Sequence, residues 1–198
     1  NIYIYRDIYM KFYKVLNELL ENKNARFIIA KDTEYQENYL NSKNEPSTHT
    51  LYSKQFSFFD KLKDYETFCN KDNNCYEICK DKNRKIYFDI DNVDLSYDEC
   101  MEYIEGFIKL VSQLLEVDND FTQYLIKVNE GERIKSIHII NTKYYMNYED
   151  NKQLSTYINE SQKNYIVDLC VYNQNQQFRN VNQSKLSKKV KNKVLNHA

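Results

Sequence analysis

The chain has 198 residues, of which 41% are hydrophobic and 29% are charged, and its formal net charge at pH 7 is −1. This length fits one domain, or one domain with a small accessory lobe, and the net charge excludes a surface that is basic throughout. No apolar run reaches the length of a membrane span and nothing resembles a signal peptide, so we expect no membrane partner.

The first half of the chain is expected to contain two helices and one short strand. Apolar residues at helical spacing predict a helix over Asp7–Asn22, and a short apolar run predicts a strand over Arg26–Ala30. The polar segment Lys31–Thr50 holds the only Pro and is expected to be a loop. Near-helical spacing predicts a second helix over Tyr52–Phe68, and the charged segment Asn70–Lys85 is expected to be a loop.

The second half mixes strands with helices. Ser96 and Glu99 form a possible capping box, which would open a helix that ends near Leu115. A weaker helical pattern covers Tyr148–Ser161. Apolar, β-prone runs predict four strands, at Ile86–Ile90, Phe121–Val128, Ile134–Asn141 and Tyr165–Val171. This order of elements predicts the α+β class.

Charge is distributed unevenly along the chain. The last thirty residues, Leu169–Ala198, contain no Asp or Glu and carry several Lys, whereas Asp89–Glu105 is acidic. An acidic patch close to a basic one would suit a divalent metal ion beside phosphate.

The five cysteines are odd in number and irregular in spacing, which indicates reduced thiols and an intracellular location whose compartment is not resolved. Cys69, Cys75 and Cys79 cluster loosely and would allow a zinc site. A fourth ligand at a recognised spacing is missing, so ordinary thiols are the favoured interpretation.

The first candidate site is the pair Asp89 and Asp91, which follows the run Ile-Tyr-Phe. Residues two apart on a strand point to the same face, and two neighbouring carboxylates are costly unless a cation neutralises them. Hard oxygen ligands favour Mg²⁺ or Mn²⁺. Asp-x-Asp pairs also occur in loops, glycosyltransferases and nucleases, so the pair alone is not specific.

Further candidates follow along the chain. Ser136 and His138 share a face of one predicted strand and could hold phosphate oxygens, although a histidine satisfied in the core is an alternative. Asp168 could complete a carboxylate trio, or could cap a turn. Arg179 and Lys185 could grip a triphosphate, or could belong to a solvated basic tail.

In their order along the chain, these residues resemble the three motifs of the archaeo-eukaryotic primase superfamily. The closest resemblance is to its primase-polymerase branch, with the related primases of large DNA viruses. The matching residues are Tyr87-Phe88-Asp89-Ile90-Asp91, then Ser136-Ile137-His138, then Asp168 with Val171-Tyr172, Phe178-Arg179 and Ser184-Lys185.

Two features depart from the family pattern. The first motif is Asp-x-Asp where the primase-polymerase branch commonly has Asp-x-Glu, which leaves the preferred ion open. Lys54-Gln55 resembles the family's Arg-Gln helix, whose basic residue contacts the incoming nucleotide, with Lys in place of Arg.

The resemblance covers about Tyr52 to Lys185. It implies an archaeo-eukaryotic primase catalytic core of two small α/β modules, one with a sheet like that of RNA-recognition domains, with the active site between them. Residues 1–50 would then be an accessory segment, 51–185 the catalytic core and 186–198 a basic tail. The implied activity is template-directed nucleotidyl transfer, as a DNA primase or DNA polymerase, in DNA replication or damage tolerance.

The resemblance also implies a role for each site residue. Asp89, Asp91 and Asp168 would be catalytic and would hold one or two Mg²⁺ or Mn²⁺ ions. The triphosphate would be bound by Ser136, His138, Arg179, Lys185 and Lys54, with help from Lys135. The side chain of Lys135 is expected to leave its strand on the face opposite Ser136 and His138.

The implied partners are a single-stranded DNA template with its primer, nucleoside triphosphates, and a fused or separate helicase and zinc-binding domain. Two alternatives from other classes remain at this point: a non-catalytic nucleic-acid-binding module with the same fold, and a metal-dependent nuclease. Intact carboxylates argue against the first, and residues placed to hold a triphosphate argue against the second.

Overall fold

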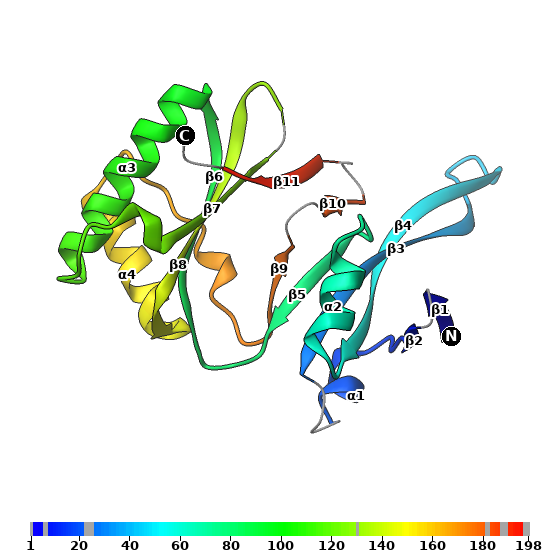
Figure 1. Ribbon diagram of the computed structural model, residues 1–198. Coiled ribbons are helices and arrows are strands. Elements are labelled where there is room, and N and C mark those ends of the chain that lie inside the picture. The colour runs from blue at the N-terminus through cyan, green and yellow to red at the C-terminus, as the bar shows by residue number, and fades with distance from the viewer. Residues whose placement is uncertain are drawn as a thin grey trace. The chain divides into compact units, whose positions relative to one another are not determined.

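The computed structural model describes residues 2–5, 8–21, 26–129, 131–180, 183–186 and 190–195. The chain forms two compact units: Asn1–Ile78 with Gln177–Lys191, called here the first unit, and Cys79–Gln176 with Asn192–Ala198, the second unit. Both units combine strands and helices (Figure 1), which confirms the expected α+β class. The predicted division into accessory segment, catalytic core and basic tail concerns function, and it stays a prediction.

The sheet of the first unit has the strand order β4-β3-β5-β9. Strands β3 (Phe27–Leu40) and β4 (Pro46–Phe59) form a long antiparallel hairpin, and β5 (Cys75–Cys79) pairs antiparallel with the other edge of β3. The short strand β9 (Gln176–Arg179) lies next to β5. The sheet is therefore assembled from segments that are far apart in the sequence.

Each face of this sheet has its own hydrophobic core. On one face Ile28, Ala30 and Phe56 pack with Leu19 of helix α1 (Leu16–Leu20). On the other face Ile29 and Phe59 pack with Phe68 of helix α2 (Leu62–Cys69). Because successive residues of a strand point to opposite faces, apolar residues at consecutive positions are buried on both sides.

Three expectations for the first unit are wrong. The segment Lys31–Thr50 is the body of the β3–β4 hairpin, and the expected helix over Tyr52–Phe68 is strand up to Phe59 and helical only from Leu62, in α2. The expected loop Asn70–Lys85 contains β5 and the start of the next strand. The spacing of Phe56 and Phe59 suggested a helix, but a separation of three places them on opposite faces of a strand, and both faces are buried there.

The N-terminal segment also differs from its expected helix. Strands β1 (Ile2–Tyr5) and β2 (Ile8–Lys11) pair antiparallel, and among the described residues of this segment only α1 is helical. Asp7 and Asn22, the ends of the expected helix, lie outside the described residues. The expected strand at Arg26–Ala30 is confirmed as the beginning of β3, which starts at Phe27.

In the second unit, β8 (Ile134–Asn147) lies between β6 (Asn83–Leu95) and β7 (Tyr124–Asn129) and is antiparallel to both. Since β6 and β7 are therefore parallel, they form a split β-α-β arrangement with helix α3 (Tyr97–Leu114) as the connection.

Two short strands follow late in the chain. Strand β11 (Val190–Val194) pairs antiparallel with β7 from Asn192 onward. In the first unit, the two-residue strand β10 (Ser184–Lys185) pairs with the first residues of β11.

The core of the second unit lies between the sheet and its helices. Phe88 of β6 is 1% exposed and meets Phe107 of α3 edge to face, with ring centroids 5.0 Å apart. The expected capping box of Ser96 and Glu99 is present at the start of α3. Helix α4 has the expected bounds, Tyr148–Ser161. The strands and helices expected in this part of the chain are therefore mostly confirmed.

Two strand predictions in the second unit are wrong, one at its first residues and the other over its whole length. Residues Phe121–Gln123 form a 3-10 helix, so β7 begins only at Tyr124. The expected strand Tyr165–Val171 is irregular and ends in a 3-10 helix over Leu169–Val171. The Asp168 carboxylate accepts a hydrogen bond from the Cys170 N–H (2.8 Å), which turns the chain away from an extended course.

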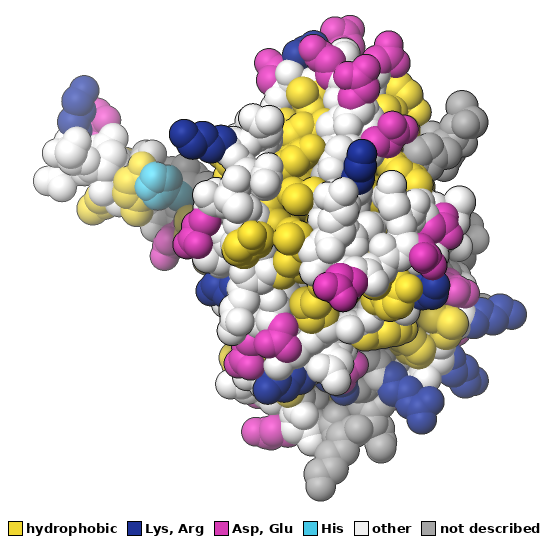
Figure 2. All heavy atoms as spheres, turned by 90° about the vertical axis from the view of Figure 1, so that its left-hand side faces the viewer, with side chains coloured by type: hydrophobic (Ala, Val, Ile, Leu, Met, Phe, Trp, Pro, Cys, Tyr) yellow, Lys and Arg dark blue, Asp and Glu magenta, His cyan; other side chains and the backbone are white. Residues whose placement is uncertain are grey.

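The helix side of the second unit carries charges of both signs. Figure 2 looks onto this side and shows acidic side chains gathered at its top, the level at which α3 begins in Figure 1. None of the described helices has both the length and the apolar character that a membrane-spanning helix needs.

Candidate functional site

Strands β6 and β8 carry four polar residues in register. Asp89 lies opposite His138 and Asp91 lies opposite Ser136, so the four side chains share one face of the sheet. The residues between them, Ile90 and Ile137, are fully buried on the other face with 0% exposure. The predicted shared faces of Asp89 with Asp91, and of Ser136 with His138, are confirmed. We call these four residues the polar quartet.

Asp168 joins this face from a segment that follows α4. Its backbone N–H donates to the carbonyl oxygen of Asp89 (2.7 Å), which fixes the two residues side by side. Asp89, Asp91 and Asp168 each offer one carboxylate oxygen, and these oxygens all lie within 4.8 Å of one another. Asp168 therefore does both things considered from the sequence: it caps a turn, and it joins the other two carboxylates in what we call the acidic trio.

A reciprocal pair of tyrosines holds the Asp168 segment against β6. The Tyr87 hydroxyl donates to the carbonyl of Val171 (2.7 Å), and the Tyr172 hydroxyl donates to the carbonyl of Tyr87 (2.9 Å). The two rings stack with centroids 5.0 Å apart. Burial raises the pKa of Tyr87 to about 12 and that of Tyr172 further, so both hydroxyls keep the protons that they donate.

Helix α4 fixes the same segment from its other side. The Asn159 side chain exchanges two hydrogen bonds with the backbone of Val167, at 2.8 and 2.9 Å. The Ser155 hydroxyl lies 2.7 Å from the Tyr172 hydroxyl. The position of Asp168 is thus set by contacts to both β6 and α4 rather than by membership of a strand.

His138 lies directly against the acidic trio. Its Nε2 is 3.2 Å from Oδ1 of Asp89, and both side chains are largely shielded, with 12% and 13% of their surface exposed. Lys127 of β7 lies opposite His138 on its other side and is 6% exposed. The sequence analysis missed Lys127, although its place between Ile126 and Val128 in a β-prone run could have assigned it to the polar face.

The acidic trio has the donor set that a hard divalent cation takes. Carboxylate oxygens are the preferred ligands of Mg²⁺, Mn²⁺ and Ca²⁺, and oxygens on opposite sides of one such ion lie about 4–5 Å apart. The spread of up to 4.8 Å in the trio matches that requirement. Three carboxylates this close repel one another unless a cation or a proton intervenes. The trio could therefore bind a metal ion.

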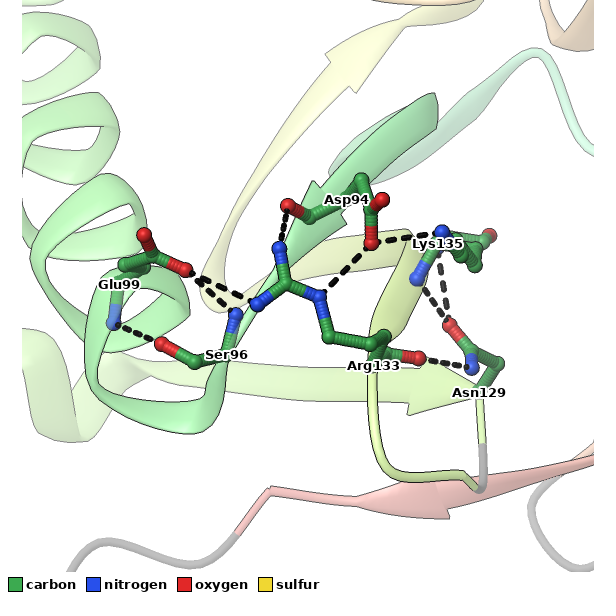
Figure 3. A network of polar contacts seen from close by, with 7 residues as sticks. Asp94, Ser96, Glu99, Asn129, Arg133 and Lys135 are labelled. Carbon is green, nitrogen blue, oxygen red and sulfur yellow. Dashed lines mark hydrogen bonds and ion pairs between the residues drawn. The ribbon is translucent and has the colours of Figure 1, made fainter.

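Lys135 is engaged elsewhere. Its ammonium lies 2.6 Å from Oδ1 of Asp94, and Nε of Arg133 lies 2.9 Å from the same oxygen (Figure 3). These two partners hold the pKa of the exposed Asp94 carboxyl at about 2. Asn129 accepts hydrogen bonds from the backbone N–H groups of Lys135 (2.6 Å) and Ser136 (3.0 Å) and so steadies the start of β8. The structure thus pairs the Lys135 ammonium with Asp94 rather than with the polar quartet.

Lys54 and Arg179, both expected to bind phosphate, belong to the first unit and meet at one aromatic ring. The Lys54 ammonium lies 3.5 Å from the ring centroid of Tyr76, and the Arg179 guanidinium carbon lies 6.0 Å from it. Lys54 also pairs with Asp32 at 3.2 Å. Lys54 lies on strand β4, so the expectation that it belongs to a helix is wrong.

Two further expectations concern Lys185 and the cysteines. The backbone of Lys185 forms part of β10, but its side chain lies outside what the structure describes. Cys69 and Cys75 have sulfurs 3.9 Å apart and are free thiols, as is Cys79. Among the described residues, the acidic trio is the group of His, Cys, Asp and Glu side chains that could hold a metal, so ordinary thiols remain the favoured interpretation.

No model of a known protein family matches the chain, and no curated protein matches it. The likeness to archaeo-eukaryotic primases therefore depends on the motif residues themselves. The structure adds an observation that is independent of this likeness: three carboxylates from two distant segments converge on one face of a sheet.

Proposed function

We propose that the protein is a template-directed nucleotidyltransferase of the primase-polymerase kind, which extends a DNA primer or joins the first nucleotides of one. The observation that carries this proposal is the convergence of Asp89, Asp91 and Asp168, whose oxygens lie within 4.8 Å of one another. These residues stand at the first and third positions of the motif order that the sequence shares with archaeo-eukaryotic primases.

In the proposed reaction, the 3′-hydroxyl oxygen of the primer bonds to the α-phosphorus of a nucleoside triphosphate, and the hydroxyl proton passes to solvent. The bond from that phosphorus to the oxygen bridging the α- and β-phosphates breaks, and pyrophosphate leaves. The acidic trio would hold one or two Mg²⁺ or Mn²⁺ ions, which supply charge stabilisation at the transferred phosphoryl group and lower the pKa of the attacking hydroxyl. The hydrogen bond from the Asp168 backbone N–H to the Asp89 carbonyl oxygen holds Asp168 beside Asp89 before any ligand binds.

Ser136 and His138 would bind oxygens of the triphosphate next to the acidic trio. Asp89 lies 3.2 Å from the His138 Nε2 and so orients the imidazole ring, and the register places the Ser136 hydroxyl beside Asp91. A hydroxyl and an imidazole N–H are both donors suited to phosphate oxygens. The same face of the sheet therefore offers ligands for a divalent cation and ligands for the triphosphate that the cation accompanies.

The remaining proposed contacts are cationic. Lys54 and Arg179 share one surface of the first unit and would bind the triphosphate, as would Lys185. Lys135 has an ammonium already paired with Asp94, so we assign it a supporting role at most. Single-stranded template and primer, and a helicase or zinc-binding domain, are the proposed partners.

The decisive experiment is primer extension. The purified chain would be incubated with a primed single-stranded template, nucleoside triphosphates and Mn²⁺ or Mg²⁺, beside the double variant Asp89→Ala/Asp91→Ala. Asp94→Ala is a matched control, because Asp94 lies on the same strand but outside the acidic trio. Extension by the wild type and the control, and its loss in the double variant, is the expected result.

Absence of extension with either ion, despite measurable binding of template, would contradict the proposal. The chain would then be better described as a nucleic-acid-binding module with the same fold. Cleavage of the template that depends on the trio would instead point to a nuclease.

A further inference from the structure

We infer that the first unit carries its own polyphosphate-binding surface, in which Asp32 and Tyr76 are positioning residues that hold Lys54 and Arg179 ready for the nucleotide. This inference rests on the proposed function for the identity of the ligand, a nucleoside triphosphate. Asp32 and Tyr76 belong to none of the motifs that the sequence analysis singled out.

The four residues form one row across four neighbouring strands. Lys54 on β4 lies opposite Asp32 on β3, and Tyr76 on β5 lies opposite Ala30 of β3, two residues from Asp32. Side chains at these positions share a face of the sheet. Arg179 extends the row on β9, the strand next to β5. We call these residues the basic row, although Asp32 lies within it.

The contacts within the basic row connect every member to Tyr76. The Tyr76 hydroxyl donates to Oδ2 of Asp32 (2.9 Å), while the other Asp32 oxygen pairs with the Lys54 ammonium at 3.2 Å. Burial and the neighbouring Asp32 charge raise the pKa of Tyr76 to about 12, so the hydroxyl keeps its proton and remains a donor. The ring itself lies under the Lys54 ammonium.

Burial makes this arrangement firm rather than a chance surface contact. The Asp32 side chain is 12% exposed and that of Lys54 is 33% exposed. Tyr76 packs partly against the core of Ile28, Ala30 and Phe56, which is on the same face of the sheet. A lysine side chain alone has several rotatable bonds, and fixing it in advance lowers the entropy that ligand binding must otherwise remove.

The row has the charge pattern that a polyphosphate requires. Two cations near one ring, Lys54 and Arg179, would repel each other in isolation, and the single charge of Asp32 offsets part of that repulsion. The row keeps one net positive charge from these three residues, and both cationic groups remain donors to phosphate oxygens. Asp32 and Tyr76 thus act through Lys54 and Arg179 and do not themselves contact the ligand.

The test measures binding of inorganic tripolyphosphate by calorimetry, without divalent ions or template, so that the acidic trio does not contribute. We expect Lys54→Ala/Arg179→Ala to weaken binding about 100-fold, Tyr76→Leu about 10-fold and Tyr76→Phe about 3-fold. Asp32→Asn should weaken binding about 3-fold, since it frees the Lys54 side chain. Tyr35→Phe and Glu34→Gln, on the same strand β3 but outside the row, should bind as the wild type does.

Thermal melting of each variant checks that the fold is kept, and Tyr76→Phe retains the packed ring if Tyr76→Leu does not fold. In primer extension, Tyr76→Phe and Asp32→Asn should raise KM for the nucleoside triphosphate and leave kcat unchanged, which loss of fold alone would not do.

Three results would overturn the inference. The first is no binding of tripolyphosphate by the wild type, and the second is wild-type binding by both Tyr76 variants. The third is tighter binding by Asp32→Asn, because it would mean that Asp32 competes with phosphate for Lys54. Binding in the expected order by a chain that extends no primer would leave the inference standing and refute the proposed function. Primer extension with an unchanged KM in these variants would refute the inference and leave the proposed function standing.

Discussion

The sheets of the two units present polar groups in opposite electrostatic arrangements. In the second unit, three carboxylates converge to within 4.8 Å, with His138 against one of them. In the first unit, two cations share one ring and an internal carboxylate pairs with one of them. The basic row includes a carboxylate that offsets part of its positive charge, whereas the three carboxylates of the acidic trio outnumber the one imidazole that lies against them. The difference indicates that ions should affect the stability of the second unit far more than that of the first.

The largest expected effect is stabilisation by divalent ions. Mn²⁺ or Mg²⁺ at about 100 times its dissociation constant should stabilise the wild type by about 2.7 kcal/mol, because the ion binds the folded trio and not the unfolded chain. Asp91→Asn should lose most of this gain. Thermal melting with and without the ion measures the difference.

Lys54→Met is the matched variant in the first unit, and the divalent ion should stabilise it as much as it stabilises the wild type. If Asp91→Asn is stabilised by the ion as much as the wild type is, the ion binds elsewhere and the trio is not a metal site.

A smaller effect is expected from the tyrosine pair that holds Asp168. Tyr172→Phe leaves the buried carbonyl of Tyr87 without this donor and should cost about 1–3 kcal/mol of the free energy of unfolding, measured by urea denaturation. The variant should also reduce the gain from Mn²⁺, since Asp168 is then less firmly placed. Tyr157→Phe on α4 is the control, because Tyr157 is 54% exposed and should tolerate the change. An unchanged stability of Tyr172→Phe would mean that the contacts of Asn159 suffice.

The smallest effect concerns Asp94, whose partners lower its pKa from the usual 3.8 to about 2. A carboxyl with a lowered pKa in the folded state stabilises the protein above its unfolded pKa and loses that contribution as the pH falls toward the folded value. The melting temperatures of the wild type and Asp94→Asn should therefore differ slightly at pH 5 and converge near pH 2. Because 61% of the Asp94 side-chain surface is exposed, solvent screening keeps the difference small. Equal curves for the wild type and Asp94→Asn at every pH would show that the pairing contributes nothing.

The sequence predicted most of the second unit because its periodicities are unambiguous. In α3 the apolar residues recur at helical spacing behind a capping box, and in β8 polar and apolar residues alternate from Ser136 to Ile139. Such patterns reflect one buried face, and one buried face specifies one kind of element. Two-residue spacing likewise predicted the shared face of Asp89 with Asp91 and that of Ser136 with His138. It did not predict that the two pairs lie opposite each other, which comes from the pairing of β6 with β8.

The first unit was predicted poorly because its sheet is buried on both faces near Ile28 and Ile29 and exposed on both from Glu34 to Leu40. Neither situation produces alternation, so the pairing of β3 with β4 was not visible in the sequence. Asp32 and Tyr76 were missed for the same reason. Their importance comes from pairing between strands, which places residues far apart in the chain next to each other.

The first unit is built from two separate stretches of the chain, so its residues are synthesised at different times. All of Cys79–Gln176 lies between Tyr76 and Arg179 in the chain. At a synthesis rate of roughly 5–20 residues per second, the stretch takes on the order of ten seconds to translate. During that time Lys54, Asp32 and Tyr76 have emerged without Arg179, whereas the acidic trio is complete once Asp168 has been added. A nascent chain would therefore possess its three carboxylates before it possesses its second cation.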